Sequence, residues 1–149
     1  GVTAAYLFAN TLVVLEVTAE VLRQTLERCA AYFTLVNGQP QISEEFLLPK
    51  VEHYNYDFYA GLSYTFDLRR PVGSRVIHLT KLDGSPLGSG KFRLCTSNYR
   101  ATGTGGYEIL RKCPVLWRGG TEMPDLTARY IRKFSPVPPL TNVEMKVVW

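Results

Sequence analysis

A glycine-rich segment between two tyrosines is the part of the sequence best suited to contact a ligand. Residues 103–106 read Gly-Thr-Gly-Gly, and Tyr99 and Tyr107 flank them. Because glycine has no side chain, the backbone of such a segment can approach a bound molecule closely, and aromatic rings beside it provide flat apolar surfaces. The same residues also fit a tight turn between two core tyrosines, so both interpretations stay open at this point.

The glycines do not match the patterns of known phosphate-binding loops. Glu108 stands where the dinucleotide-binding fingerprint has its third glycine. The other glycine cluster, residues 88–91, lacks the first glycine of a P-loop and is followed by Phe92 where a P-loop has Ser or Thr. We therefore interpret residues 88–91 as a turn.

The residue types that hydrolytic catalysis needs are scarce. His53 and His78 belong to no metal-ligand spacing, and the chain has no Gly-x-Ser-x-Gly nucleophile segment. Cys29, Cys95 and Cys113 are an odd number without a zinc or redox spacing, so each is interpreted as a small apolar residue. The sequence predicts no catalytic residue, metal ion or cofactor within this chain.

A second aromatic group occupies residues 54–59, which read Tyr-Asn-Tyr-Asp-Phe-Tyr. The interleaved amide and carboxylate make this segment too polar for a core strand. Rings with hydrogen-bonding groups between them suit sugars and nucleobases, which are bound by stacking and by contacts to their edges. The segment is therefore predicted to line a binding site for a planar ligand.

Composition and charge exclude several classes of protein. The chain has 149 residues, of which 46% are hydrophobic and 20% charged, and its formal net charge is +4; these values are typical of one globular domain. Its basic residues are scattered, which argues against polynucleotide binding. No apolar run approaches the ~20 residues of a membrane span, so no membrane insertion is expected. The chain begins with Gly1 and has no leader pattern, so we interpret it as a piece of a longer protein.

The elements that must position these residues alternate between strands and helices. The mixture predicts an α+β domain in which helices cover a mixed, largely antiparallel sheet. A helix capped by Thr18 has an apolar face at helical spacing, and a long connection follows it. The expected elements are a strand over residues 11–17, the helix over 19–33, the connection over 39–50, a meander of strands near 63–68, 75–82 and 91–96, an apolar segment over 115–117, a second helix from Pro124, and a strand over 143–149.

Four strings in this sequence are similar to one known family. The string from Phe8 to Thr18 and the string Asn-Tyr-Arg-Ala at 98–101 with its glycine-rich loop resemble two segments of the C-terminal domain of the 5′-nucleotidase family. The strings at 54–61 and 67–76 are similar to the branch of 2′,3′-cyclic-nucleotide 2′-phosphodiesterase/3′-nucleotidases. The resemblance runs in order from about residue 6 to about residue 132.

The resemblance implies a two-domain, secreted enzyme. An N-terminal metallophosphatase domain, absent from this chain, would hold two divalent metal ions and the catalytic histidine. Residues 1–149 would be the C-terminal domain that binds the nucleotide or nucleoside. In the family two aromatic rings clamp the base, and these positions fall on Phe8 and Tyr99, with a hydrogen-bonding amide at Asn10. The family also implies a periplasmic, extracellular or cell-wall location.

The glycine-rich loop departs from the family pattern in one informative way. In the 5′-nucleotidase branch an aspartate of this loop holds the ribose hydroxyls, and here Gly105 stands in its place, two residues after Gly103. A substrate with phosphate on its 2′ and 3′ oxygens has no free diol and would be repelled by a carboxylate. This favours cyclic and 3′-nucleotides, with the nucleotide contacted at Phe8, Asn10, Tyr99, Gly103 and Gly105.

Two alternatives stay open. The parent protein could be a 5′-nucleotidase despite Gly105, or a non-catalytic module that binds nucleosides or acts at a cell surface. In the family an arginine-bearing segment that also contacts the ligand precedes the position of Phe8. The isolated chain is therefore expected to bind nucleotides weakly.

Overall fold

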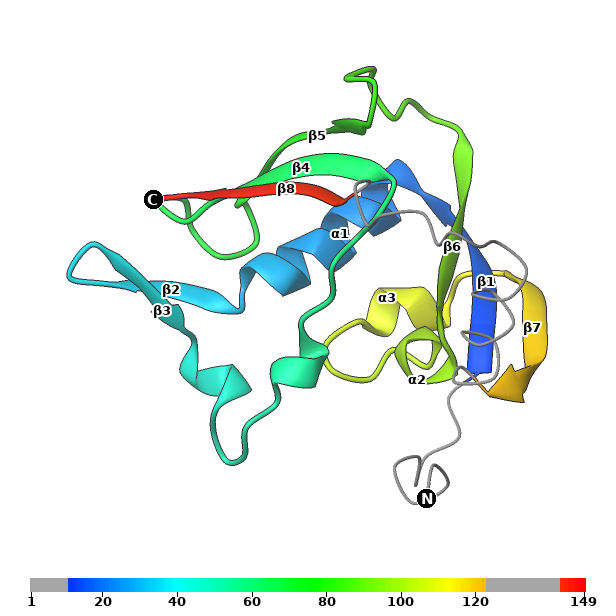
Figure 1. The fold of residues 1–149 in the computed structure, drawn as a ribbon, viewed down its shortest axis with the longest axis horizontal. Coiled ribbons are helices and arrows are strands. Elements are labelled where there is room, and N and C mark those ends of the chain that lie inside the picture. Colours follow the sequence, from blue (N-terminus) through cyan, green and yellow to red (C-terminus); the bar gives the residue numbers. More distant parts are fainter. Residues whose placement is uncertain (1–10, 123–142) are drawn as a thin grey trace, which may run out of the picture. The chain divides into compact units, whose positions relative to one another are not determined.

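The computed structural model describes residues 11–122 and 143–149 of the chain. They fold into two compact units. Unit 1 contains residues 11–17 and 91–122 of the described chain, and unit 2 contains residues 18–90 and 143–149. Figure 1 shows the elements of both. Each unit is built from segments that are far apart in the sequence.

Unit 1 is a three-stranded sheet with two short helices. Strand β1 (Thr11–Thr18) lies between β6 (Lys91–Ser97) and β7 (Val115–Glu122), and β1 and β7 are antiparallel. The buried side chains of β1 alternate at Val13, Leu15 and Val17, the period expected of a strand with one covered face. The two helices, α2 (Asn98–Ala101) and α3 (Glu108–Arg111), follow β6 in the chain.

Unit 2 combines a second sheet with the long helix. Strand β4 (Leu62–Asp67) pairs with β5 (Val76–Lys81) antiparallel and with β8 (Val143–Val148) parallel. Helix α1 (Ala19–Ala30) contacts β5. It begins at Thr18, whose hydroxyl accepts a hydrogen bond from the Val21 backbone N–H at 3.3 Å, and this N-cap confirms the predicted helix start.

A buried arginine closes the far end of α1. The Arg75 guanidinium donates to the carbonyl oxygens of Ala30 at 3.0 Å, Phe33 at 2.6 Å and Arg70 at 3.0 Å. The carboxylate of Glu27 accepts from the backbone N–H groups of Arg75 at 2.8 Å and of Val76 at 2.9 Å. Carbonyls at a helix end lack intrahelical partners, so Arg75 supplies a donor to the Ala30 carbonyl at the end of α1.

The predicted end of the helix was wrong. Helix α1 stops at Ala30 because the chain turns into a hairpin of β2 (Phe33–Val36) and β3 (Gln39–Ile42). Asn37 and Gly38 have φ angles of +52° and +76°, which is the geometry of a two-residue hairpin turn. The expected long connection over 39–50 therefore contains strand β3 and the short 3₁₀ helix η2 (Glu44–Phe46), and a second 3₁₀ helix, η3 (His53–Asn55), follows it.

The predicted meander was also wrong, although the fold class is α+β as expected. Strands β4 and β5 form a hairpin, but β6 pairs with β1 in the other unit. The turn at Gly84, with φ +86°, folds the chain back after Lys81, and Pro86 forms one isolated bridge to Thr80 before the chain continues to β6. The described chain thus has three small sheets. The helix predicted from Pro124 lies outside the described residues.

Within the described ranges, none of the helices has the length and apolarity that crossing a membrane requires.

Candidate functional site

Helix α2 is a single turn that places Tyr99 at the end of strand β6. Ser97 caps it, because the Ser97 hydroxyl accepts from the Arg100 backbone N–H at 3.1 Å. The side-chain oxygen of Asn98 accepts from the Thr11 backbone N–H at 3.2 Å. The first residue of β1 is therefore tied to the residue immediately before Tyr99.

Tyr99 combines a fixed backbone with an open ring. Its carbonyl oxygen accepts from the Thr102 hydroxyl at 2.6 Å and from the Thr104 hydroxyl at 2.9 Å. The residue is nevertheless 39% exposed, whereas Tyr107 at the other end of the loop is 1% exposed. Of the two tyrosines that flank the glycines, one therefore belongs to the core and the other is partly exposed.

A buried cation lies against both of these rings. Arg100 is 4% exposed, and the central carbon of its guanidinium lies 4.0 Å from the Tyr107 ring centroid and 5.5 Å from that of Tyr99. Its Nη1 donates to the Thr104 carbonyl at 2.9 Å. The guanidinium thus joins the glycine loop to the two tyrosines by contacts that are favourable for a cation.

The glycine loop is a tight turn that needs its glycines. Gly103, Gly105 and Gly106 have φ angles of +86°, +79° and +95°, which side-chain-bearing residues rarely adopt. At Gly103 a β-carbon would also lie 2.9 Å from the Glu108 Cα. The turn is closed by hydrogen bonds from the Gly103 N–H to the Arg100 carbonyl and from the Tyr107 N–H to the Gly103 carbonyl, at 3.0 and 3.1 Å.

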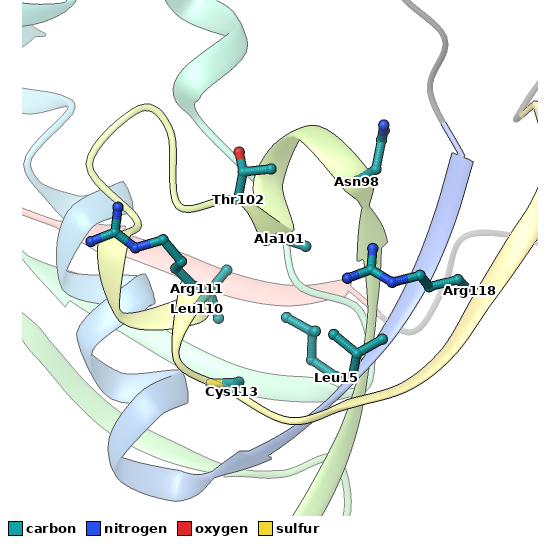
Figure 2. Close-up of a pocket in the computed structure, with 9 residues that line it drawn as sticks. Leu15, Asn98, Ala101, Thr102, Leu110, Arg111, Cys113 and Arg118 are labelled. Atoms are coloured by element: carbon teal, nitrogen blue, oxygen red, sulfur yellow. The ribbon is translucent and has the colours of Figure 1, made fainter.

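A pocket of about 260 Å³ lies beside α2, and its lining includes one arginine from α3 and one from β7. In Figure 2 the Arg118 side chain extends from β7 toward α2 and Leu15, while the Arg111 guanidinium points away from the other labelled side chains. Among the described residues, no acidic side chain lines this pocket. Its surroundings therefore suit an anionic group. The lining residues are Leu15, Asn98, Ala101, Thr102, Leu110, Arg111, Cys113, Val115 and Arg118.

Three of the five predicted contact residues lie together in this part of unit 1. Tyr99, Gly103 and Gly105 belong to α2 and the loop after it. Phe8 and Asn10 lie outside the described residues. Sequence reasoning missed Arg100 and Arg118. Arg100 could have been found from its place beside Tyr99, whereas Arg118 has no distinguishing sequence signal.

The aromatic segment at residues 54–59 is partly buried and partly exposed. The Tyr56 ring packs against those of Tyr32 and Phe33, with centroids 4.8 and 5.6 Å away, and burial, with smaller contributions from neighbouring groups, raises the pKa of its hydroxyl. Asn55 and Tyr59 are 2% and 7% exposed. Tyr54 and Phe58 are 55% and 65% exposed. The segment is therefore not a core strand, as predicted, and its role in lining a binding site stays a prediction.

Metal-ligating side chains are not gathered in the described part of the chain. Residues 11–122 and 143–149 contain no group of three or more His, Cys, Asp or Glu side chains that could hold an ion. One of the two histidines, His53, has its Nδ1 2.8 Å from the Tyr32 hydroxyl oxygen, so it is engaged with a half-buried tyrosine.

Comparisons with curated proteins identify nucleotide phosphoesterases. The chain is 30% identical over 149 residues to the 2′,3′-cyclic-nucleotide 2′-phosphodiesterase/3′-nucleotidase of Haemophilus influenzae, in a match that covers 87% of this chain and 22% of that protein. It is 26% identical over 147 residues to the trifunctional nucleotide phosphoesterase protein YfkN of Bacillus subtilis, covering 90% of this chain and 10% of the relative. The chain thus spans about a fifth or less of these curated relatives.

Solved structures share the fold. A putative 5′-nucleotidase from Staphylococcus aureus, crystallised in complex with alpha-ketoglutarate, superposes with a TM-score of 0.89 at 34% identity, over 97% of this chain and 28% of that one. A 5′-nucleotidase precursor from Thermus thermophilus superposes with a TM-score of 0.61 at 22% identity, over 94% of this chain and 25% of that one. The family model of the 5′-nucleotidase C-terminal domain matches residues 2–112. The chain therefore belongs to the family of 5′-nucleotidase C-terminal domains, which these larger nucleotide phosphoesterases contain.

Proposed function

We propose that the chain is the substrate-binding domain of a secreted phosphoesterase that hydrolyses 2′,3′-cyclic nucleotides and 3′-nucleotides. The observation that carries this proposal is the ring of Tyr99, which is 39% exposed while two threonine hydroxyls hold its carbonyl. A ring on a fixed backbone loses little conformational freedom when a base stacks on it. Stacking on an aromatic side chain contributes about 1–3 kcal/mol per base.

The proposed clamp has a second ring, Phe8, and an amide, Asn10. Both precede Thr11, whose N–H is bound by the side chain of Asn98. Since Asn98 and Tyr99 are consecutive, this bond brings the chain that follows Asn10 to the same helix that carries the stacking ring. That proximity supports the assignment of Phe8, Asn10 and Tyr99 to one ligand.

The chemistry of the loop supports cyclic and 3′-nucleotides as substrates. Residues 98–107 contain no acidic side chain. Gly105 occupies the position at which the similar loop of the 5′-nucleotidase branch has its ribose-binding aspartate. Arg111 and Arg118 line the adjacent pocket. A site without carboxylates and with cations nearby attracts a ligand whose ribose oxygens carry phosphate.

The hydrolytic step is assigned to a separate domain. We propose that an N-terminal metallophosphatase domain of the longer protein holds two divalent metal ions, which would activate water and stabilise charge on the phosphate. This chain would bind the base and direct the phosphate toward that domain. We further propose that the protein acts outside the cytoplasm, in the periplasm or at the cell wall; fractionation of cells that express the full gene, with the activity measured in each fraction, tests this.

Titration of the 149-residue chain tests the binding half of the proposal. Adenosine and 3′-AMP are expected to shift the ring resonances of Tyr99 at millimolar concentration, and Tyr99→Ala should remove the binding. Trp149→Ala is a matched control, because Trp149 is also an exposed aromatic residue, 57% exposed, but belongs to unit 2. Saturating ligand that leaves the Tyr99 signals unchanged contradicts stacking, and phosphatase activity of the purified chain contradicts the assignment of catalysis elsewhere.

Kinetics of the full-length protein test the substrate class. We expect kcat/KM for 2′,3′-cyclic AMP and 3′-AMP to exceed that for 5′-AMP, and Gly105→Asp to reduce this preference, since aspartate tolerates the positive φ of +79° better than most residues. Preferred hydrolysis of 5′-AMP would establish the 5′-nucleotidase alternative. Nucleoside binding without hydrolysis in the presence of divalent metals would establish the non-catalytic module.

A further inference from the structure

Arg100 has no role in the proposed function, yet it is held directly against the proposed stacking ring. It is 4% exposed, and arginine is rarely so deeply buried unless its charge is accommodated. Among the described residues, two aromatic rings and one carbonyl contribute to this accommodation. The guanidinium carbon lies 5.5 Å from the Tyr99 centroid and 4.0 Å from the Tyr107 centroid, and Nη1 donates to the Thr104 carbonyl at 2.9 Å.

Both the backbone and the side chain of Arg100 are fixed. Its N–H donates to the Ser97 hydroxyl that caps α2, and its carbonyl accepts from the Gly103 N–H at 3.0 Å. The same threonine that receives the guanidinium also donates its hydroxyl to the Tyr99 carbonyl at 2.9 Å. The cation therefore cannot leave the Tyr99 ring without disturbing the loop that holds Tyr99.

A cation beside one face of an aromatic ring changes what the other face prefers. The face of a tyrosine ring carries the negative part of its quadrupole, and the guanidinium draws this electron density toward itself. The opposite face becomes less negative. An electron-rich purine stacks more favourably on such a face than an electron-poor pyrimidine does, in addition to the general advantage of its larger area.

We propose that Arg100 is a positioning residue that sets the base preference of this domain. By holding and polarising the Tyr99 ring, it favours purine over pyrimidine nucleosides. The inference rests on the proposed function, because it requires the base to stack on Tyr99. Both classes of base are still bound, since stacking tolerates any base. The expected contribution of Arg100 to the purine preference is about two- to fivefold, the range of a cation–π contact at a partly exposed ring.

Dissociation constants for adenosine and uridine test the proposal, because neither nucleoside is charged. Arg100→Gln removes the cation and should lower the ratio of uridine to adenosine dissociation constants by about two- to fivefold. Arg100→Lys keeps a charge without the planar fork and should give an intermediate ratio. Arg93→Gln is the control, since it removes an exposed arginine of strand β6 in the same unit and should leave the ratio unchanged.

The outcomes separate this inference from the proposed function. If Arg100→Gln weakens both nucleosides equally, its role is only structural and the inference is overturned. If Tyr99→Ala leaves nucleoside binding intact, stacking itself fails and the proposed function fails with it. If Arg100→Gln does not fold, a second nucleoside tests the proposal on the unsubstituted chain. This chain should bind 7-deazaadenosine, whose base is richer in electrons, more tightly than adenosine. Equal or weaker binding of 7-deazaadenosine contradicts the proposal.

Discussion

Tyr56 and Tyr99 carry the same ring in the two units and use it in opposite ways. Tyr56 lies in a crowded aromatic segment and packs against Tyr32, Phe33 and Phe58. Tyr99 stands apart from other aromatic residues in the sequence, is 39% exposed, and has the cation of Arg100 over its ring. The comparison teaches that aromatic residues close together in the sequence can pack on one another, while a single partly exposed ring on a fixed turn is the better candidate for a ligand.

The two deeply buried arginines repeat this contrast. Arg75 gives its donors to three carbonyl oxygens around the end of α1, and burial lowers the pKa of its guanidinium while Glu27 opposes that effect. Arg100 gives one described donor to a carbonyl and its planar face to two rings. In unit 2 the buried charge satisfies backbone groups, and in unit 1 it supports side chains at a surface.

The largest expected effect separates the two tyrosines. Tyr56→Ala should lower the free energy of unfolding by about 3–4 kcal/mol, because it removes a large ring from a packed cluster. Tyr99→Ala should change it by less than about 1 kcal/mol, since the ring is partly exposed. Urea denaturation of both variants measures this. A greater loss of stability in Tyr99→Ala than in Tyr56→Ala would contradict the comparison.

Arg75→Met should have the next largest effect. Methionine fills a similar volume but leaves the carbonyls of Ala30, Phe33 and Arg70 without their donor, so we expect a loss of about 2–3 kcal/mol in unfolding free energy. Nucleoside affinity of the folded variant should be unchanged. Thermal denaturation and a parallel adenosine titration measure the two quantities, and a selective loss of adenosine binding in Arg75→Met would show that the division of roles is wrong.

Gly84 in unit 2 and Gly103 in unit 1 provide a further test of the difference between the units, because both have a φ angle of +86°. A β-carbon added at Gly103 would lie 2.9 Å from the Glu108 Cα, while one added at Gly84 would meet nothing within 4 Å. Both Ala variants lose stability through the backbone, by about 1 kcal/mol, and Gly103→Ala should lose about 1–2 kcal/mol more through overlap. Equal melting temperatures would exclude the predicted crowding of this loop.

The smallest expected effect is on how much stability unit 2 loses at acidic pH. Hydrogen bonds from the Arg69 side chain, at 2.9 and 3.0 Å, lower the pKa of the Asp67 carboxyl below its ordinary value of 3.8. Because the folded pKa lies below the unfolded one, the carboxylate stabilises the fold above the unfolded pKa and ceases to do so as the pH falls through the folded one. Melting temperatures between pH 6 and pH 2 should therefore fall less steeply in Asp67→Asn than in the unsubstituted chain or in Asp57→Asn.

Local sequence patterns predicted most strands and the start of α1. The β-branched run at residues 11–17 and the alternation at 63–68 each became a strand, and Thr18 caps the helix as expected. These features depend on neighbouring residues. The end of α1 was harder to predict because Phe33 continues the apolar face of the helix, while its pairing with Ile42 in the β2–β3 hairpin decides the outcome.

The same patterns could not predict which strands pair with each other or which side chains are buried. Nothing in residues 91–97 distinguishes a partner in β5 from a partner in β1, because strand propensity does not encode which edge a strand joins. The candidate site was found in part: Tyr99 and its glycines were visible as residue types, whereas the exposure of one tyrosine and the burial of Arg100 depend on how the loop folds.

The parallel pairing of β4 with β8 has a consequence for the order of assembly. Every residue from Leu62 to Asp67 is aligned with one from Val143 to Val148, so unit 2 lacks a sheet strand until the ribosome has made the last of these. Unit 1 has all its described strands once residue 122 has emerged. Folding during synthesis is then nested: the described strands of unit 1 are all available while one edge of β4 in unit 2 is still unpaired and open to mispairing.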